Sequence, residues 1–394
     1  MNAQDIINKK GRILALIACL LITFVMGSIH AFSTLIEGIE LQTNVGRMSS
    51  SLIYSTALVN GTLAVYVGHI LYRKFSTVKL ISLMAILPMV GLFFSNSGTW
   101  IGWLIGYGIF FGFSSGVGYG LSLHIASSVT DKNKLGFTLG LVTASYAFGA
   151  VIFSVFFPIF FKYFGFENGY MIGIGSISIV VIIALFLFMS SRVKLKKGEV
   201  ISNKKNSTSP KILKLWFGYF LGVFAGLMTI AHAVPLIISF GGSVGLSITT
   251  ISIMSLGSGI AGLCAGWLVD QFGCKRPLLV ILIINSIAIF SLAMMTSVSL
   301  LFILLVLIAS LYGAIIAIYP TLVNHLVGND LSAKVYGRVF TAWGAAGLIA
   351  PSLAGWLFDQ YNNYNASLLF SLILSIIAGL VIWNIKYDVI RSKQ

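Results

Sequence analysis

Positive charge in this chain falls on one side of a repeating apolar pattern. Long apolar segments alternate with short polar loops, and 23 of the 25 Lys and Arg residues lie in every second loop or at the chain ends. The two exceptions are Arg47 and Lys162. Because basic loops are retained on the cytoplasmic side of a membrane, this distribution predicts an even number of spans with both termini in the cytoplasm.

The composition excludes an ordinary soluble domain. Of the 394 residues, 58% are hydrophobic and 9% are charged, whereas a soluble chain carries about a quarter charged residues. Twelve helices of about 20 residues each would cross a hydrocarbon layer about 30 Å thick. The net charge of +15 belongs to loops at the membrane, so we expect an all-α membrane protein with no nucleic-acid partner.

The apolar segments predict twelve membrane-spanning helices in two sets of six. The expected spans are 12–36, 48–71, 78–96, 100–127, 135–161, 168–190, 215–240, 246–270, 276–296, 299–326, 336–358 and 366–386. The expected domains are an N-terminal six-helix bundle at 1–190, a basic cytoplasmic linker at 191–214 and a C-terminal six-helix bundle at 215–394. The linker is too charged to enter a membrane and too poor in apolar residues to pack.

The two sets of spans resemble each other. Ser28-Ile-His30-Ala aligns with Ile230-Ala-His232-Ala, and His124 aligns with His325. Secondary transporters use two such six-helix halves to build a site near the membrane midplane and to rock about it. The repeat therefore predicts a transporter, with His30 and His232 deep in spans 1 and 7.

The loop between spans 8 and 9 reads Gly266-Trp-Leu-Val-Asp270-Gln-Phe-Gly273-Cys-Lys275-Arg276. This spacing resembles the loop signature of the major facilitator superfamily, and the resemblance implies a fold of two six-helix halves. Gly266 permits close helix approach, Asp270 can cap a neighbouring helix and Gly273 permits a tight turn. We interpret these residues, with Lys275 and Arg276, as conformational gating residues.

The corresponding loop of the first half departs from that signature. Tyr72 stands in place of the Asp, and Phe75 stands in place of the second Gly. We therefore expect the gating contact to differ between the halves. His124 and His325 lie near the inner ends of spans 4 and 10, where we assign them a gating or packing role.

Three stretches resemble the oxalate/formate antiporter family and its monocarboxylate-transporter relatives, which exchange small carboxylates. They begin at Gly27, Gly226 and Thr341 and read GSIHAFS, GLMTIAHAVP and TAWG followed by APSLAG. Gly262 and Trp343 stand where the oxalate/formate pattern usually has an arginine and a lysine. Burying a dianion without these cations would cost several kcal/mol or more. We therefore expect a monocarboxylate or related metabolite rather than oxalate.

Histidine is the titratable group near the middle of the spans, because Lys, Arg, Asp and Glu are missing there. Its charge changes near neutral pH, and ionisable residues at membrane depth are functional by default. The residues expected to bind substrate or protons are His30, His232, Trp343, Tyr119, Tyr146 and Tyr319. The alternative is a neutral histidine bonded to a neighbouring helix, and for each tyrosine a helix–helix contact.

The sequence thus predicts a secondary active transporter that moves a small organic solute across the cytoplasmic (inner or plasma) membrane by alternating access. An efflux carrier for an amphipathic or neutral compound is the alternative with the same fold, and a membrane sensor is the alternative of another class. No nucleophile–base pair, zinc signature or nucleotide motif predicts an enzyme, a metal or a cofactor. The expected partners are the solute, protons and the lipid bilayer, and the expected state is a monomer.

A protease site added at either terminus should be cleaved only from the cytoplasmic face, because the basic loops fix the direction of the first and last spans. Cleavage in inside-out and right-side-out membrane vesicles measures this. Cutting of either terminus in right-side-out vesicles would contradict the predicted topology.

Overall fold

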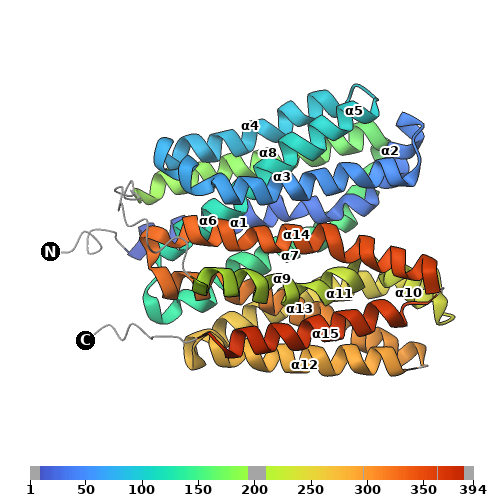
Figure 1. The fold of residues 1–394 in the computed structure, drawn as a ribbon. Helices are drawn as coiled ribbons and strands as arrows, with labels where there is room; N and C mark the ends of the chain where they lie inside the picture. The colour runs from blue at the N-terminus through green and yellow to red at the C-terminus, as the bar shows by residue number, and fades with distance from the viewer. Residues whose placement is uncertain (1–8, 194–209, 296, 362, 386–394) are drawn as a thin grey trace. The chain divides into compact units, whose positions relative to one another are not determined.

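The computed structural model describes residues 9–193, 210–295, 297–361 and 363–385, which are helical and contain no strand (Figure 1). The elements in chain order are α1 (Lys9–Met26), η1 (Gly27–Thr34), α2 (Ile36–Thr43), α3 (Arg47–Lys74), α4 (Thr77–Ser95), α5 (Trp100–Trp103), η2 (Leu104–Phe111), α6 (Gly112–Val129), η3 (Lys132–Lys134), α7 (Leu135–Phe164), α8 (Phe166–Ser191), α9 (Pro210–Ala231), α10 (Ala233–Ser239), α11 (Val244–Phe272), α12 (Lys275–Met294), α13 (Val298–Val327), α14 (Asn329–Tyr361) and α15 (Asn365–Trp383).

Eleven helices of the described part are long and apolar enough to cross a membrane. The remaining long helix, α3, covers the expected second span and has 28 residues, which gives it a length of about 42 Å. Its apolar residues are interrupted by Asn60, His69 and several Ser and Thr residues. The predicted all-α membrane fold is confirmed, with α3 more polar than the other long helices.

The chain forms two compact units. Unit 1 comprises Met1–Asp131 and Ser145–Ile201, and unit 2 comprises Lys132–Ala144 and Ser202–Gln394. Helix α7 therefore begins in unit 2 and continues in unit 1. The expected basic linker lies largely outside the described residues, between 194 and 209. The division into two six-helix bundles joined by this linker stays a prediction.

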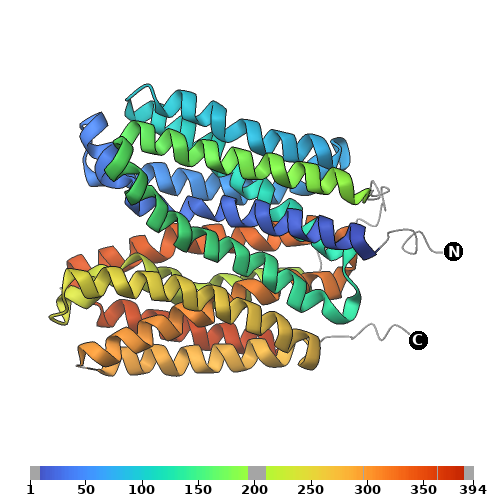
Figure 2. The same cartoon turned by 180° about the vertical axis from the view of Figure 1, so that it is seen from behind.

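Close backbone approach holds the helices of unit 1 together, and both cartoon views show them side by side (Figures 1 and 2). Helix α1 packs against α6 and α8, and α3 packs against α6. A Cβ added at Gly149 of α7 would lie 1.7 Å from the Phe24 carbonyl oxygen, and one at Gly27 would lie 1.8 Å from that of Tyr146. Small residues permit such packing where lipid removes the hydrophobic drive for association.

Unit 2 is built around a buried apolar cluster. Helix α9 packs against α13, α14 and α15, and α11 packs against α13. Phe224, Ile289 and Leu305 belong to the cluster that these helices and α12 bury. Polar contact is present as well, since the buried Asn285 amide donates to Ser375 over 3.1 Å.

The expected spans at 12–36, 100–127 and 215–240 are not continuous α-helices. The first changes to a 3-10 helix at η1, the fourth contains the π-helix η2, and the seventh breaks between α9 and α10. In and beside η1, the hydroxyls of Ser28 and Thr34 donate to carbonyls three residues earlier, over 2.6 and 2.7 Å. Such local bonds compete with the regular helix ladder.

Gly149→Ala should lower the melting temperature, because the added methyl group meets the Phe24 backbone of α1 and overpacking costs about 1–3 kcal/mol. Gly175→Ala in α8 is the matched control, since nothing lies within 4 Å of a Cβ there. Thermal unfolding of both purified variants measures the difference. Equal melting temperatures would contradict the α1–α7 packing described for unit 1.

Candidate functional site

In unit 1, the 3-10 helix η1 places His30 beside two tyrosines. Its ring Nδ1 lies 2.6 Å from the Tyr54 hydroxyl, and the Tyr146 ring meets it edge-on with centroids 5.5 Å apart. The Ser115 hydroxyl donates to the Met26 carbonyl over 3.0 Å. Because that donation uses the only hydrogen of Ser115, the Tyr146 hydroxyl donates to Ser115, over 2.9 Å.

Further aromatic rings complete this group. The Tyr119 ring lies 5.2 Å from that of Tyr146. The buried Tyr107 hydroxyl donates to the Ile29 carbonyl over 2.9 Å, which joins the π-helix η2 to the 3-10 helix η1. Phe32 stacks on Tyr54 at 5.3 Å and packs against Tyr107 at 5.1 Å.

We call Tyr54, Tyr107, Tyr119 and Tyr146, with His30, the tyrosine cluster. It brings together three of the expected site residues, His30, Tyr119 and Tyr146. Sequence reasoning missed the roles of Tyr54 and Tyr107, because a helical sequence does not show which face of spans 2 and 4 meets span 1. That Tyr54 of span 2 and Tyr107 of span 4 contact the interrupted span 1 is visible only in the fold.

In unit 2, His232 stands at the break between α9 and α10. Its Nε2 lies 2.9 Å from the Pro351 carbonyl oxygen, and its Nδ1 lies 3.1 Å from the Tyr364 hydroxyl. A carbonyl oxygen only accepts, so Nε2 carries a hydrogen, and in the neutral ring Nδ1 accepts from Tyr364. This arrangement matches the alternative of a neutral histidine bonded to neighbouring segments.

Trp343 and Tyr319 occupy different surroundings in unit 2. The Trp343 ring stacks on Phe340 at 5.2 Å, and its Nε1 donates to the Tyr312 hydroxyl over 2.8 Å. Tyr319 is fully buried and stacks on Tyr219 with centroids 4.0 Å apart. Trp343 thus combines an aromatic face with a fixed polar edge, whereas Tyr319 forms a helix–helix contact.

The loop signature makes a double cap inside unit 2. The Asp270 carboxylate accepts from the backbone N–H groups of Gly136 and Phe137, each over 2.7 Å. These N–H groups belong to the first turn of α7, where the helix dipole favours a negative charge. A Cβ at Gly266 would lie 2.4 Å from the Gly136 carbonyl oxygen, and Gly273 has φ of +74°. The expected helix cap, close approach and tight turn are therefore all present.

The two basic residues of the signature, Lys275 and Arg276, have different surroundings. Lys275 donates through Nζ to the carbonyls of Trp383 and Ile385, over 2.7 and 3.0 Å, at the C-terminal end of α15. Arg276 is exposed. His325 contacts the Cys274 sulfur through Nδ1 at 3.5 Å, and burial raises the pKa of the Cys274 thiol to about 12.

The equivalent end of unit 1 is built from aromatic rings. His124 stacks on Tyr72 with ring centroids 5.3 Å apart and an interplanar angle of 15°. Tyr72 occupies the position that Asp270 has in the second half. Unit 1 thus has a ring stack where unit 2 has a carboxylate cap, and a gating role for either stays a prediction.

The described residues contain no group of three His, Cys, Asp or Glu side chains able to hold a metal ion. Ion pairing is also sparse in the described part of the chain, where Arg12 binds Asp131 over 3.0 Å at an exposed end of unit 1. The polar chemistry within the spans therefore comes from imidazole, indole, hydroxyl and amide groups.

Comparison with known proteins shows a likeness to one transporter superfamily and to its fold. Residues 215–391 match the family model described as Major Facilitator Superfamily. The oxalate:formate antiporter of Oxalobacter formigenes is 25% identical over 278 residues, which cover 67% of this chain and 66% of the antiporter. A multi-drug resistance efflux pump PmrA homolog of Lactococcus lactis is 22% identical over 98% of this chain and 96% of its own length.

Among solved structures, the fold resembles that of the proton:xylose symporter XylE with a TM-score of 0.76. The sequences are 16% identical, and the match covers 95% of this chain and 96% of the symporter. At that identity the likeness concerns the fold alone.

Asp270→Ala should lower the stability by about 0.5–2 kcal/mol, because two N–H groups at the start of α7 lose their acceptor. Thermal unfolding of the purified protein measures this, and a transport assay shows whether the cap also controls conformational exchange. Asp330→Ala is the matched control, since it also removes one acidic charge at an exposed position. Equal stability of the two variants would contradict the capping role.

Proposed function

We propose that this chain is a transporter of the major facilitator superfamily and moves a small monocarboxylate or related metabolite across the cytoplasmic membrane by alternating access. The family-model match and the curated relatives support a membrane transporter rather than an enzyme. The proposal concerns the solute, the proton coupling, the cytoplasmic orientation of both termini and the monomeric state.

The observation that carries this proposal is the interruption of one helix in each unit at a histidine. In unit 1 the 3-10 helix η1 holds His30, and in unit 2 the break after α9 falls at His232. Each ring presents Nδ1 to a tyrosine hydroxyl, that of Tyr54 or of Tyr364. Interrupted spans form the solute and coupling-ion sites of many secondary transporters, because their backbone groups are turned away from the helix ladder.

Charge balance favours a monocarboxylate. The middle of the spans contains no Lys or Arg. The positive charge that pairs with a bound anion must therefore come from a proton or cation taken up together with that anion. A proton taken up by His30 supplies one such charge. It would neutralise one carboxylate, whereas a dicarboxylate would keep a second charge without a partner at high cost.

The tyrosine cluster provides a route from that proton to the solute. A doubly protonated His30 donates from Nδ1 to the Tyr54 oxygen, 2.6 Å away. The Tyr54 hydrogen is then directed away from the ring and can bond a carboxylate oxygen. Charge-assisted hydrogen bonds of this kind are about twice as strong as neutral ones, which couples solute binding to protonation.

A second candidate function is efflux of an amphipathic compound. The stacked Trp343 and Phe340 rings are each 7% exposed and would offer an aromatic surface to an apolar solute in a conformation that uncovers them. The relative named as a multi-drug efflux pump homolog also aligns over nearly the whole chain. Under this alternative, the preferred solutes are amphiphiles, and carboxylates compete poorly with them.

His30→Gln should abolish the stimulation of carboxylate uptake by an inward proton gradient and weaken carboxylate binding about 10- to 100-fold. That loss corresponds to one charge-assisted hydrogen bond of about 1.5–3 kcal/mol. Uptake and counterflow in proteoliposomes, with labelled monocarboxylates, dicarboxylates, amino acids and amphiphiles, measure both effects. His232→Gln should change affinity less, because its ring is held by Pro351 and Tyr364.

His69→Gln is the control for this experiment. His69 is a half-buried histidine near the end of α3, and its Nδ1 lies 3.0 Å from the Tyr66 carbonyl oxygen of its own helix. Unchanged transport and affinity in the His30→Gln, His232→Gln double variant would contradict a binding role and would leave both histidines with a packing role. Transport of amphiphiles alone would favour the second candidate function.

A further inference from the structure

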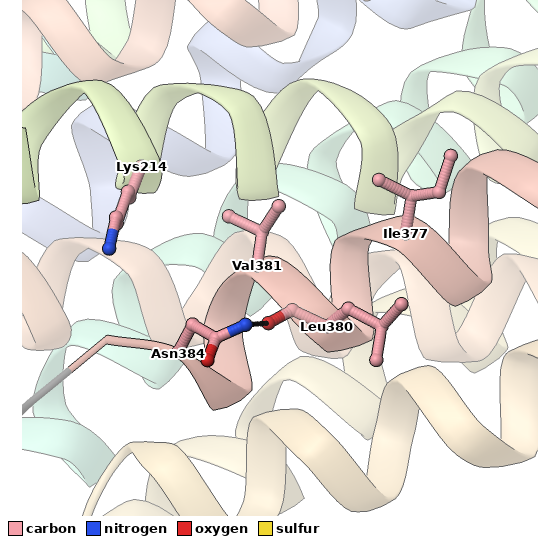
Figure 3. A pocket seen from close by; sticks show the side chains of 5 residues that line it. All are labelled: Lys214, Ile377, Leu380, Val381 and Asn384. Atoms are coloured by element: carbon pink, nitrogen blue, oxygen red, sulfur yellow. Dashed lines mark hydrogen bonds between the residues drawn. The ribbon is translucent and has the colours of Figure 1, made fainter.

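A groove of about 330 Å³ lies in unit 2 between the first turns of α9 and the last turns of α15 (Figure 3). Its lining consists of Lys214, Ile377, Leu380, Val381 and Asn384. Figure 3 shows the Lys214 ammonium and the Asn384 amide toward one end of the groove and Ile377 toward the other, so the groove is amphipathic along its length.

The apolar part of the groove is open. Leu380 is 58% exposed and Ile377 is 40% exposed. Aliphatic side chains with this exposure on a spanning helix contact lipid, since water would not stabilise them there. An acyl chain lying along this face of α15 would cover the apolar surface that the protein leaves open.

The polar part of the groove attracts anions. Among the described residues, the one ion pair joins Arg12 to Asp131. No carboxylate of the described residues therefore forms an ion pair with Lys214. The C-terminal carbonyls of α15 would repel an anion, but Lys275 donates to the carbonyl of Trp383, the last residue of α15, and to that of Ile385 just beyond it. Lys275 thus offsets the negative end of that helix dipole. The Asn384 amide bonds the Leu380 carbonyl over 3.0 Å, which fixes its side chain at the groove.

We propose that this groove binds an anionic phospholipid, with its phosphate at Lys214 and Asn384 and an acyl chain along Ile377, Leu380 and Val381. The apolar wall favours a lipid over a free phosphate ion. With the predicted topology, the groove opens to the cytoplasmic leaflet, where anionic lipids attract basic residues. The site is separate from the tyrosine cluster, so it does not depend on the identity of the transported solute.

Titration of the full-length protein with dioleoylphosphatidylglycerol or dioleoylphosphatidylcholine, followed by native mass spectrometry, tests the site. The phosphatidylglycerol should bind more tightly than the phosphatidylcholine. Lys214→Gln should weaken phosphatidylglycerol binding about fivefold, the factor expected for one basic residue at a membrane surface, and Lys214→Arg should keep most of the binding.

Lys79→Gln is the matched control, because Lys79 is exposed near the start of α4 in unit 1 and carries the same charge. Equal binding of the two lipids, or equal weakening by Lys79→Gln, would overturn the proposal in favour of unspecific attraction. Competition by inorganic phosphate at concentrations that match the lipid would identify a free-anion site and would overturn the lipid assignment.

Discussion

The satisfaction of backbone hydrogen bonds within lipid is the constraint on which this structure depends. Hydrocarbon offers no partner to an exposed N–H or C=O group, so a span that leaves the α-helical ladder needs partners from its neighbours. The two interruptions that hold histidines meet this need in different ways. In unit 1 the Tyr107 hydroxyl reaches the Ile29 carbonyl in η1, and in unit 2 His232 reaches the Pro351 carbonyl. The irregular segments are therefore also the places where polar side chains gather.

The distribution of charge follows from the same constraint. Two full charges at helix ends stabilise backbone groups: Asp270 binds the first turn of α7, and Lys275 binds one carbonyl at the end of α15 and one just beyond it. Deeper in the spans, histidine is the side chain whose charge can change near neutral pH. The fixed charges thus stabilise the helix ends, and few side chains in the middle of the spans can carry a charge. Protonation of His30 is therefore central to the proposed coupling.

Part of the candidate site was predictable from the sequence, and part was not. His30 and His232 stood out because the two halves align on them, and Asp270 stood out because its spacing from Gly266 and Gly273 matches a known signature. Tyr54 and Tyr364 did not, because each comes from a different part of the fold from the histidine that it contacts. Tyr54 lies in α3, where polar and apolar residues are mixed, and Tyr364 precedes the first turn of α15, so periodicity does not indicate which histidine either of them meets.

The sequence by itself indicated an all-helical membrane fold, a resemblance to a transporter superfamily and the two histidine positions, and it predicts the direction of the spans, because these depend on the order of apolar, basic and signature residues along one dimension. Tertiary structure decided that span 1 becomes a 3-10 helix, that span 4 contains a π-helix and that Trp343 donates to Tyr312. Those outcomes depend on which helices approach closely. In a membrane that choice is made by the fit of small residues and by a few hydrogen bonds between segments distant in the chain.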